Sequence, residues 1–234
     1  LGVKIEGIGS LKLTIHGVKN INVDVEHHNS EDPIESMMFI ASAIATGSKL
    51  TVTRCPYDFL KLELLKLEKM GVEFSFSDHY LSHNKKTNLV DVTVVKSKKL
   101  KALSDKIHAQ PYPGINTDNL PFFVPVALKA KGTTLIHDWM WENRAIYFTE
   151  LNRLGASVRL ADPHRVYIEG GEKLSNGELV CPPALRPSTM LLVTMLGIPG
   201  RSILRNVYSI KRGYENIVER LNSIGAEIKE VKEI

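Results

Sequence analysis

Residues 46–52 read TGSKLTV, and the same layout returns at residues 131–137 (KGTTLIH) and 199–205 (PGRSILR). In each copy a glycine follows an apolar, helix-like run, and a short stretch containing β-branched residues comes next. Glycine can close a helix in the left-handed backbone conformation at little cost. The three copies therefore predict three apolar helices that each end at a glycine and lead into a strand.

A second glycine follows each copy after 24, 23 or 25 residues, at Gly71, Gly155 and Gly225. The residues before these glycines are apolar at helical spacing and are expected to form buried stripes. The stripes are Leu60, Leu64 and Leu67; Phe148, Leu151 and Leu154; Ile217, Leu221 and Ile224. Alternating residues follow, as in 72–76 (VEFSF), and predict a strand in every copy, the last one beginning at residues 225–228.

One unit thus consists of an apolar helix, a strand, an amphipathic helix and a strand, with a further hairpin strand in the first two units. We expect an α/β lobe, residues 18–234, in which three such repeats (18–84, 85–170 and 171–234) place helices inside sheets with pseudo-threefold symmetry. Residues 1–17 would be a strand hairpin left from a preceding repeat, because residues 1–5 (LGVKI) copy the glycine motif without its helix. We therefore predict a fragment of a longer chain; the alternative is a complete protein with a degenerate first copy.

The composition excludes several classes of protein. The 234 residues are 43% hydrophobic and 24% charged, as in soluble globular proteins. A net charge of +4 suits an anionic small substrate but is too weak to indicate nucleic-acid binding. Cys55 and Cys181 form no disulfide or zinc pattern, which fits the cytoplasm, and the longest apolar run, 190–198, is about half of a membrane span.

The N-terminal ends of the apolar helices are where chemistry is expected, because free N–H groups and the helix dipole favour anions there. Asp118 and Arg186 each stand 14 residues before the glycine that follows their helix, at Gly132 and Gly200, so they occupy equivalent places on one rim. Asp118 could be a simple helix cap. A carboxylate there is also suited to accept a proton.

Two more arginines occupy near-equivalent places. Arg144 and Arg212 stand 11 and 13 residues before the second glycines of their units, where the amphipathic helices are expected to start. A positively charged arginine is unfavourable at the N-terminal end of a helix, so its presence there suggests a functional role. Its guanidinium group can donate two parallel hydrogen bonds to a carboxylate or a phosphate. The alternative is a pair of surface arginines bound to Glu142 and Glu215.

Other candidates are weaker. His79 and His83 are four residues apart, but they fall in an expected hairpin rather than on a helix, so we expect no metal site. Cys181 has no base near it in sequence and is interpreted as a small buried residue. A phosphate-binding glycine loop of either common type is absent from the sequence.

Five segments, in order along the chain, resemble the signatures of one family, the UDP-N-acetylglucosamine 1-carboxyvinyltransferases. Residues 111–118 (PYPGINTD) resemble a proline-rich segment that ends in Pro-Thr-Asp, and residues 141–144 (WENR) resemble Phe-Glu-Asn-Arg. The others are 32–35 (DPIE), 185–186 (LR) and 211–215 (KRGYE), which resemble Asp-Arg-Ile-Glu, the end of Asp-Leu-Arg, and Asp-Arg-Gly-Tyr-Glu. The resemblance implies a two-lobed enolpyruvyl-transferase fold, an inside-out α/β barrel, of which this chain would be the C-terminal half.

The resemblance also implies an activity, the transfer of enolpyruvyl from phosphoenolpyruvate to the 3-hydroxyl of UDP-N-acetylglucosamine, in peptidoglycan and cell-wall synthesis. It implies no cofactor and no metal. By position, Asp118 would take the hydroxyl proton and hold the sugar, and Met140 would contact the nucleotide sugar through its backbone. Arg212 would grip phosphoenolpyruvate, while Arg144 and Arg186 would shape an anionic pocket.

The sequence departs from these signatures, and three of the departures bear on the function. Ala184 and Lys211 replace aspartates, and Trp141 replaces phenylalanine. A non-catalytic binding module of the same fold, or a transferase for another hydroxyl acceptor, therefore remains an alternative. The missing N-terminal lobe, which would carry the family's cysteine acid and a Lys-Asn pair, is the expected partner. The exposed hairpin edges predict self-association.

Overall fold

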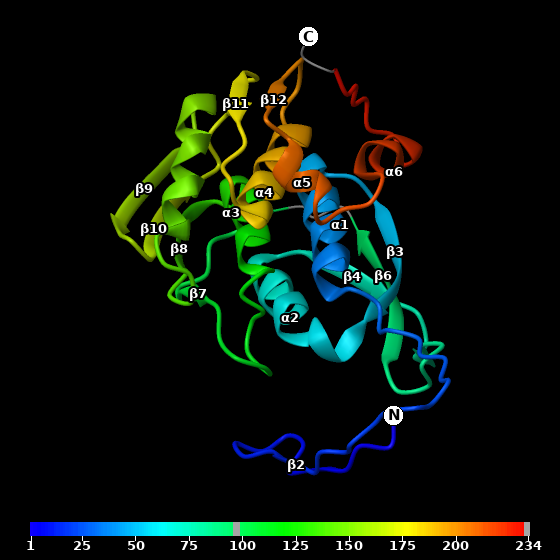
Figure 1. The fold of residues 1–234 in the computed structure, drawn as a ribbon. Coiled ribbons are helices and arrows are strands. Elements are labelled where there is room, and N and C mark those ends of the chain that lie inside the picture. The colour runs from blue at the N-terminus through cyan, green and yellow to red at the C-terminus, as the bar shows by residue number, and fades with distance from the viewer. Residues whose placement is uncertain (96–98, 232–234) are drawn as a thin grey trace.

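Three apolar helices form the centre of the molecule in the computed structural model, which describes residues 1–95 and 99–231 (Figure 1). They are α1 (Pro33–Thr46), α3 (Phe123–Lys129) and α4 (Leu185–Leu196), and each packs against the other two. Their inward residues are fully buried, as burial of apolar surface favours. These are the helices that the repeated glycine motif predicts.

Strands cover this helical centre. The first sheet has the order β3-β6-β4, with β5 also paired to β6, and the second has the order β7-β8-β10-β9. The first sheet contains β3 (Leu50–Pro56), β4 (Glu73–Phe76), β5 (Tyr80–Leu81) and β6 (Asn88–Val95), and the second contains β7 (Ile107–His108), β8 (Gly132–His137), β9 (Ser157–Asp162) and β10 (Arg165–Gly170). In both sheets the hairpin-return strand lies inside: β6 lies between β3 and β4, and β10 lies between β8 and β9. β6 thus pairs with the strands of the first unit, although the expected repeat bounds assign residues 88–95 to the second.

In each unit an amphipathic helix follows the strand that comes after the central helix. These helices are α2 (Lys61–Met70) in the first unit, η3 (Arg144–Leu154) in the second and α6 (Ile217–Ser223) in the third. Short turns η1 (Tyr57–Phe59) and η2 (Leu120–Phe122) precede α2 and α3, and α5 (Tyr208–Lys211) precedes α6. The described helices include none that is long and apolar enough to cross a membrane.

The second-unit helix is a 3₁₀ helix rather than an α-helix, and the spacing of its buried residues fits that form. Ala145, Phe148, Leu151 and Leu154 are all buried and recur at intervals of three residues. A 3₁₀ helix has three residues per turn, so this interval keeps every one of them on one face. Leu64, Leu67 and Met70 of α2 are also buried at intervals of three on an α-helix, so this spacing is compatible with a 3₁₀ helix but does not require one.

The glycines of the repeated motif behave less uniformly than expected. Gly47 caps α1 in the left-handed conformation with φ 68°. Gly132 and Gly200 also have positive φ, but α3 and α4 are capped earlier, by Ala130 and Gly197. The expectation that every such glycine closes its helix is therefore wrong for the second and third copies.

The third unit corrects another expectation. Its sheet contains only β11 (Glu178–Val180) and β12 (Ile203–Arg205), which pair in parallel, and residues 226–231 form no strand. Asn222 holds Ile228 through both backbone groups, at 2.8 and 2.9 Å, just as Asn152 holds Val158 in β9. The segment is thus aligned like β9, but within the described residues no return strand lies beside it to pair with its backbone.

Residues at the beginning of the chain lie outside the helical centre. β1 (Ile5–Glu6) and β2 (Thr14–Ile15) form an antiparallel hairpin, which Figure 1 shows apart from the other sheets. Nearly every residue from 1 to 30 is exposed.

Ile224 was expected in the buried stripe of α6, but it is 49% exposed, because α6 ends at Ser223, one residue earlier.

Candidate active site

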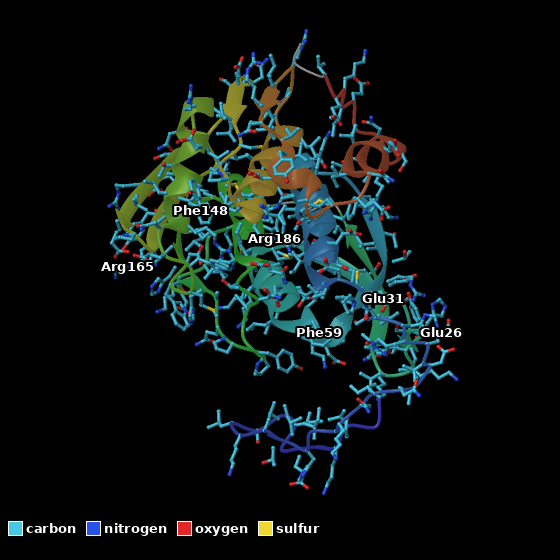
Figure 2. All side chains as sticks on the ribbon, in the orientation of Figure 1. Glu26, Glu31, Phe59, Phe148, Arg165 and Arg186 are labelled. Atoms are coloured by element: carbon cyan, nitrogen blue, oxygen red, sulfur yellow. The ribbon has the colours of Figure 1, made fainter. Side chains whose placement is uncertain are left out.

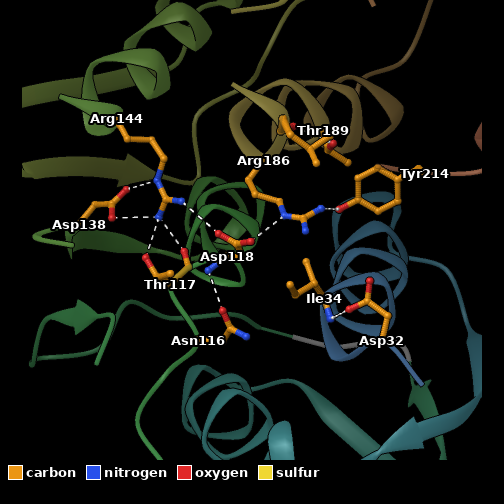
Figure 3. Close-up of polar contacts among 11 residues, drawn as sticks. Asp32, Ile34, Asn116, Thr117, Asp118, Asp138, Arg144, Arg186, Thr189 and Tyr214 are labelled. Atoms are coloured by element: carbon orange, nitrogen blue, oxygen red, sulfur yellow. Dashed lines mark hydrogen bonds and ion pairs between the residues drawn. The ribbon is translucent and has the colours of Figure 1, made fainter. Parts of the chain in front are cut away.

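The N-terminal ends of the three central helices meet on one side of the molecule (Figure 3). Asp32 caps α1 and accepts a hydrogen bond from the backbone N–H of Ile34 at 2.8 Å. Asp118 precedes η2 and α3, and Arg186 lies in the first turn of α4, which begins after Ala184 without a side-chain cap. The equal spacing of Asp118 and Arg186 in the sequence thus corresponds to adjacent places in space.

Asp118 lies between two arginines. Its Oδ1 is 3.5 Å from Nη1 of Arg144, and its Oδ2 accepts a hydrogen bond from Nε of Arg186 at 3.2 Å. Figure 3 shows the two guanidinium groups approaching the carboxylate from opposite sides. The interpretation of Asp118 as a helix cap is wrong in this structure, because Asn119 holds the cap position of η2 and no side chain caps it.

Arg144 is fixed by a buried carboxylate on its other side. Asp138, at the end of β8, has a fully buried side chain and accepts hydrogen bonds from Nε and Nη2 of Arg144, the latter at 2.9 Å. Nη2 also donates to the backbone carbonyl of Thr117 at 2.6 Å. Burial raises the pKa of Asp138, and the hydrogen bonds from Arg144 oppose that rise. Arg144 therefore pairs with Asp138 and Asp118, and the surface pairing with Glu142 is wrong.

Arg186 rests on an aromatic hydroxyl. Its Nη1 donates to the hydroxyl oxygen of Tyr214 at 3.1 Å, and its guanidinium carbon is 5.5 Å from the centre of that ring. Burial raises the pKa of Tyr214 to about 12, so its hydroxyl keeps its proton at neutral pH. Figure 2 places Arg186 near the middle of the molecule, and 15% of its side chain is exposed. Arg186 is therefore mostly buried and has a neutral second partner.

Met140 and Arg212 lie outside this cluster. Met140 is 40% exposed in the turn before η3, and Arg212 is exposed at the C-terminal end of α5. The expectation that Arg212 starts an amphipathic helix is wrong, because the helix is divided into α5 and α6. A Cβ at Gly213 would lie 2.3 Å from Leu185, and Asn216 has φ 46°, so the chain bends there.

Three polar residues behind Asp118 were not apparent from the sequence, two of them buried (Glu63 and Asn119) and one half-buried (Asn116). Glu63 of α2 is 1% exposed and accepts hydrogen bonds from the backbone N–H of Asn116 at 3.0 Å and from Nδ2 of Asn119 at 2.9 Å. Asn116 Oδ1 accepts in turn from the backbone N–H of Asp118 at 2.8 Å. One feature of the sequence could have indicated Glu63: it stands three residues after Leu60, so a charged residue lies on the face of the helix that is expected to be buried.

The arrangement can bind an anion and accept a proton. Two guanidinium groups contact one carboxylate, whose side chain is 29% exposed. Arginine forks bind carboxylate and phosphate groups, and a positioned carboxylate acts as a general base. No group of three or more potential metal-binding side chains is found among residues 1–95 and 99–231.

Comparison with known proteins assigns the chain to a family. The family model described as EPSP synthase (3-phosphoshikimate 1-carboxyvinyltransferase) matches residues 1–221. The chain belongs to the EPSP synthase family. Its relatives there include UDP-N-acetylglucosamine 1-carboxyvinyltransferases, with 37% identity to that of Treponema denticola over 100% of this chain and 53% of the relative. The protein of that name from Borreliella burgdorferi is 32% identical over 99% of this chain and 53% of its own length.

A solved structure of the same fold supports the membership. The crystal structure of the enolpyruvyl transferase NikO from Streptomyces tendae matches with a TM-score of 0.81 and 26% identity, over 98% of this chain and 51% of NikO. The chain thus has the α/β fold of enolpyruvyl transferases, and it spans about half the length of the family members that it matches.

Proposed function

We propose that this chain is the C-terminal half of a transferase that moves enolpyruvyl from phosphoenolpyruvate to the 3-hydroxyl of UDP-N-acetylglucosamine. The observation that carries the proposal is Asp118 between Arg144 and Arg186, at the N-terminal ends of the central helices. Relatives named for that reaction support the choice of substrates. We place the protein in the cytoplasm, in peptidoglycan precursor synthesis for cell shape and division.

In this proposal Asp118 takes the proton of the sugar hydroxyl and holds the sugar. The hydroxyl oxygen bonds to C2 of phosphoenolpyruvate while C3 gains a proton, and loss of phosphate together with a C3 proton restores the double bond. The anionic substrate competes with Asp118 for the arginines. Arg186 has a neutral second partner and turns more readily than Arg144, so substrate binding frees the carboxylate to act.

The exposed residues complete the proposed site. Arg212, at the end of α5, would grip phosphoenolpyruvate from the third unit, and Met140 would contact the nucleotide sugar through its backbone. The other half of the protein would supply the second wall of the cleft and the acid that protonates C3. Without that half, we expect this chain to bind substrate weakly and to be inactive.

The test is Asp118→Ala in the full-length protein, with phosphate release from phosphoenolpyruvate and UDP-N-acetylglucosamine as the readout. Loss of a general base typically lowers the rate by about 10²–10⁴-fold, and we expect kcat to fall within that range. Asp105→Ala, at a carboxylate whose side chain is 73% exposed, is the matched control and should leave kcat unchanged. Full activity of Asp118→Ala would overturn the assigned role.

A second candidate is a non-catalytic binding module, which Ala184 and Lys211 favour because both replace acidic residues of the signatures. This candidate predicts that the full-length wild type binds UDP-N-acetylglucosamine in calorimetry but releases no phosphate. A transferase for another hydroxyl acceptor would instead release phosphate only with that acceptor. A screen of hydroxyl acceptors on the full-length protein separates the three outcomes.

A further inference from the structure

The segment that carries Asp118 is held by a helix of a different unit. Glu63 belongs to α2 in the first unit, and its carboxylate reaches the second unit at the residues just before α3. It accepts the backbone N–H of Asn116 and the side-chain amide of Asn119, both through Oε1. Glu63 is 1% exposed and Asn119 is fully buried, so this contact is shielded from water.

Asn116 passes this restraint on to Asp118. Its side-chain Oδ1 accepts the backbone N–H of Asp118 at 2.8 Å, and its carbonyl accepts the N–H groups of Asn119 and Leu120 at 3.0 and 3.2 Å. The backbone from 116 to 120 is therefore fixed at both ends of a single turn. Asp118 is the residue in the middle of that turn, with its carboxylate directed at Arg144 and Arg186.

The identity of residue 116 makes the contact possible. Proline has no backbone N–H and could not donate to Glu63. The signature that residues 111–118 resemble has proline directly before Thr-Asp, where this chain has Asn116. A buried carboxylate without hydrogen-bond donors is costly, so Glu63 is tolerated on the buried face of α2 because Asn116 and Asn119 satisfy it.

We propose that Glu63 and Asn116 act together as positioning residues that hold Asp118 in its place for proton transfer. The kinetic consequence rests on the proposed function, because it requires Asp118 to be the base. The positioning of Asp118 by Glu63 and Asn116 does not rest on the proposed function, and hydrogen exchange measures it without any assay of activity.

The first test labels the full protein by hydrogen exchange and then measures, by mass spectrometry of its peptides, the exchange of residues 116–120. Removing the acceptor in Glu63→Ala is expected to speed exchange of this segment about tenfold or more, because its backbone donor loses its partner. Glu63→Gln keeps an acceptor oxygen and should remain within about threefold of wild type. Glu68→Ala, at an exposed glutamate of the same helix, is the control. Unchanged exchange in Glu63→Ala would overturn the proposal.

The second test is kinetic and uses the full-length protein. Misplacing a base weakens an interaction made in the transition state, so Glu63→Ala should lower kcat about tenfold per folded molecule while KM for both substrates stays within about threefold. Glu63→Gln should restore kcat. An unchanged kcat in folded Glu63→Ala contradicts the positioning role. A wild type without transferase activity contradicts the proposed function instead, and the exchange experiment still decides the positioning.

The third test is a double-mutant cycle between the two residues. Asn116→Pro alone removes a donor from Glu63, and Glu63→Leu alone removes the acceptor of Asn116. In the double variant, Glu63→Leu with Asn116→Pro, both the carboxylate and the backbone N–H of their mutual hydrogen bond are absent, so neither is left without the other. Exchange of residues 116–120 should therefore increase by less than the product of the two single effects. Multiplicative effects would show that the two residues act independently and would overturn the proposal.

Discussion

The two arginines beside Asp118 differ in their second partners, and this difference decides how each can act. Arg144 is bound by the buried carboxylate of Asp138, whereas Arg186 is bound by the neutral hydroxyl of Tyr214. A charged hydrogen bond in a buried place is considerably stronger than a neutral one near the surface. Arg144 is thus held more firmly than Arg186, and in the proposed mechanism Arg186 is the arginine that the anionic substrate draws away from Asp118.

Asp138→Ala tests the first of these roles. It leaves the guanidinium of Arg144 buried without its main partner, which typically costs about 3–5 kcal/mol of unfolding free energy. Urea denaturation measures this loss. Glu150→Ala, which breaks the exposed pair between Glu150 and Arg153, should cost less than about 1 kcal/mol. Equal losses in the two variants would contradict a structural role for the Asp138–Arg144 pair.

At the scale of single residues, the sequence revealed part of the site. The equal distances of Asp118 and Arg186 from Gly132 and Gly200 predicted their proximity, because equivalent places in symmetric units meet at the symmetry axis. Asp138 and Tyr214 carried no comparable signal. Their roles arise from contacts between segments that lie far apart in the chain, which a spacing pattern within one unit does not describe.

Among the elements, α2 connects stability to pH through Glu63. Burial raises the pKa of Glu63 above its ordinary value of 4.5, while hydrogen bonds from Asn119 and Asn116 oppose the rise. The folded protein therefore holds this proton more tightly than the unfolded chain does. The stability that Glu63 contributes is full below the unfolded pKa and falls as pH rises toward the folded value.

Glu63→Gln should remove this dependence. We expect the unfolding free energy of the wild type to fall relative to that of Glu63→Gln as pH rises from 4.5 upward. Urea denaturation of both proteins in a pH series gives the difference directly. Glu68→Gln, on the exposed face of α2, should follow the wild type at every pH. A wild type that gains stability relative to Glu63→Gln over this range would disprove the assigned direction.

The glycine at the end of α2 has a second constraint that its third-unit equivalent lacks. Gly71 has φ 101°, and a Cβ there would lie 2.8 Å from the carbonyl oxygen of Lys99. Gly225 has φ 103°, and a Cβ there would have no atom within 4 Å. Alanine in the left-handed conformation costs about 1–2 kcal/mol at either position. Gly71→Ala should therefore lower the thermal midpoint clearly more than Gly225→Ala, and similar midpoints would contradict this.

The order of elements was predictable, but their detailed form was only partly so. Glycine spacing and apolar periodicity indicated the central helices and the strands of the first two units. The 3₁₀ form of η3 was not predictable, because buried residues at intervals of three also occur on the α-helix α2. The division between α5 and α6 lies at Asn216, whose left-handed backbone with φ 46° is not indicated by the apolar periodicity.

At the scale of the whole molecule, residues 1–30 add exposed apolar surface without a core of their own. Leu11, Leu13 and Ile15 are 110%, 55% and 61% exposed, and an isolated two-stranded hairpin is marginally stable. Exposed apolar hairpins tend to associate. We expect chain 1–234 to self-associate in light scattering after gel filtration.

Lysines at two of these positions should reduce the association. The variant with Leu13→Lys and Ile15→Lys adds charge to the hairpin, so its average mass should fall toward that of a monomer. Leu65→Lys, at a leucine of α2 that is 44% exposed, is the control for added charge elsewhere. If both variants associate as the wild type does, the hairpin is not the contact surface.

The three units are joined in a closed ring. Glu63 of the first unit binds Asn119 of the second, Asp118 of the second binds Arg186 of the third, and Arg220 of the third returns to Glu35 of the first. Repeat proteins that stack in a line have end units and can lengthen by duplication. A closed ring has no end at which a copy can be added, so evolution could exchange or diversify these units but could not insert a fourth without opening one of the three junctions.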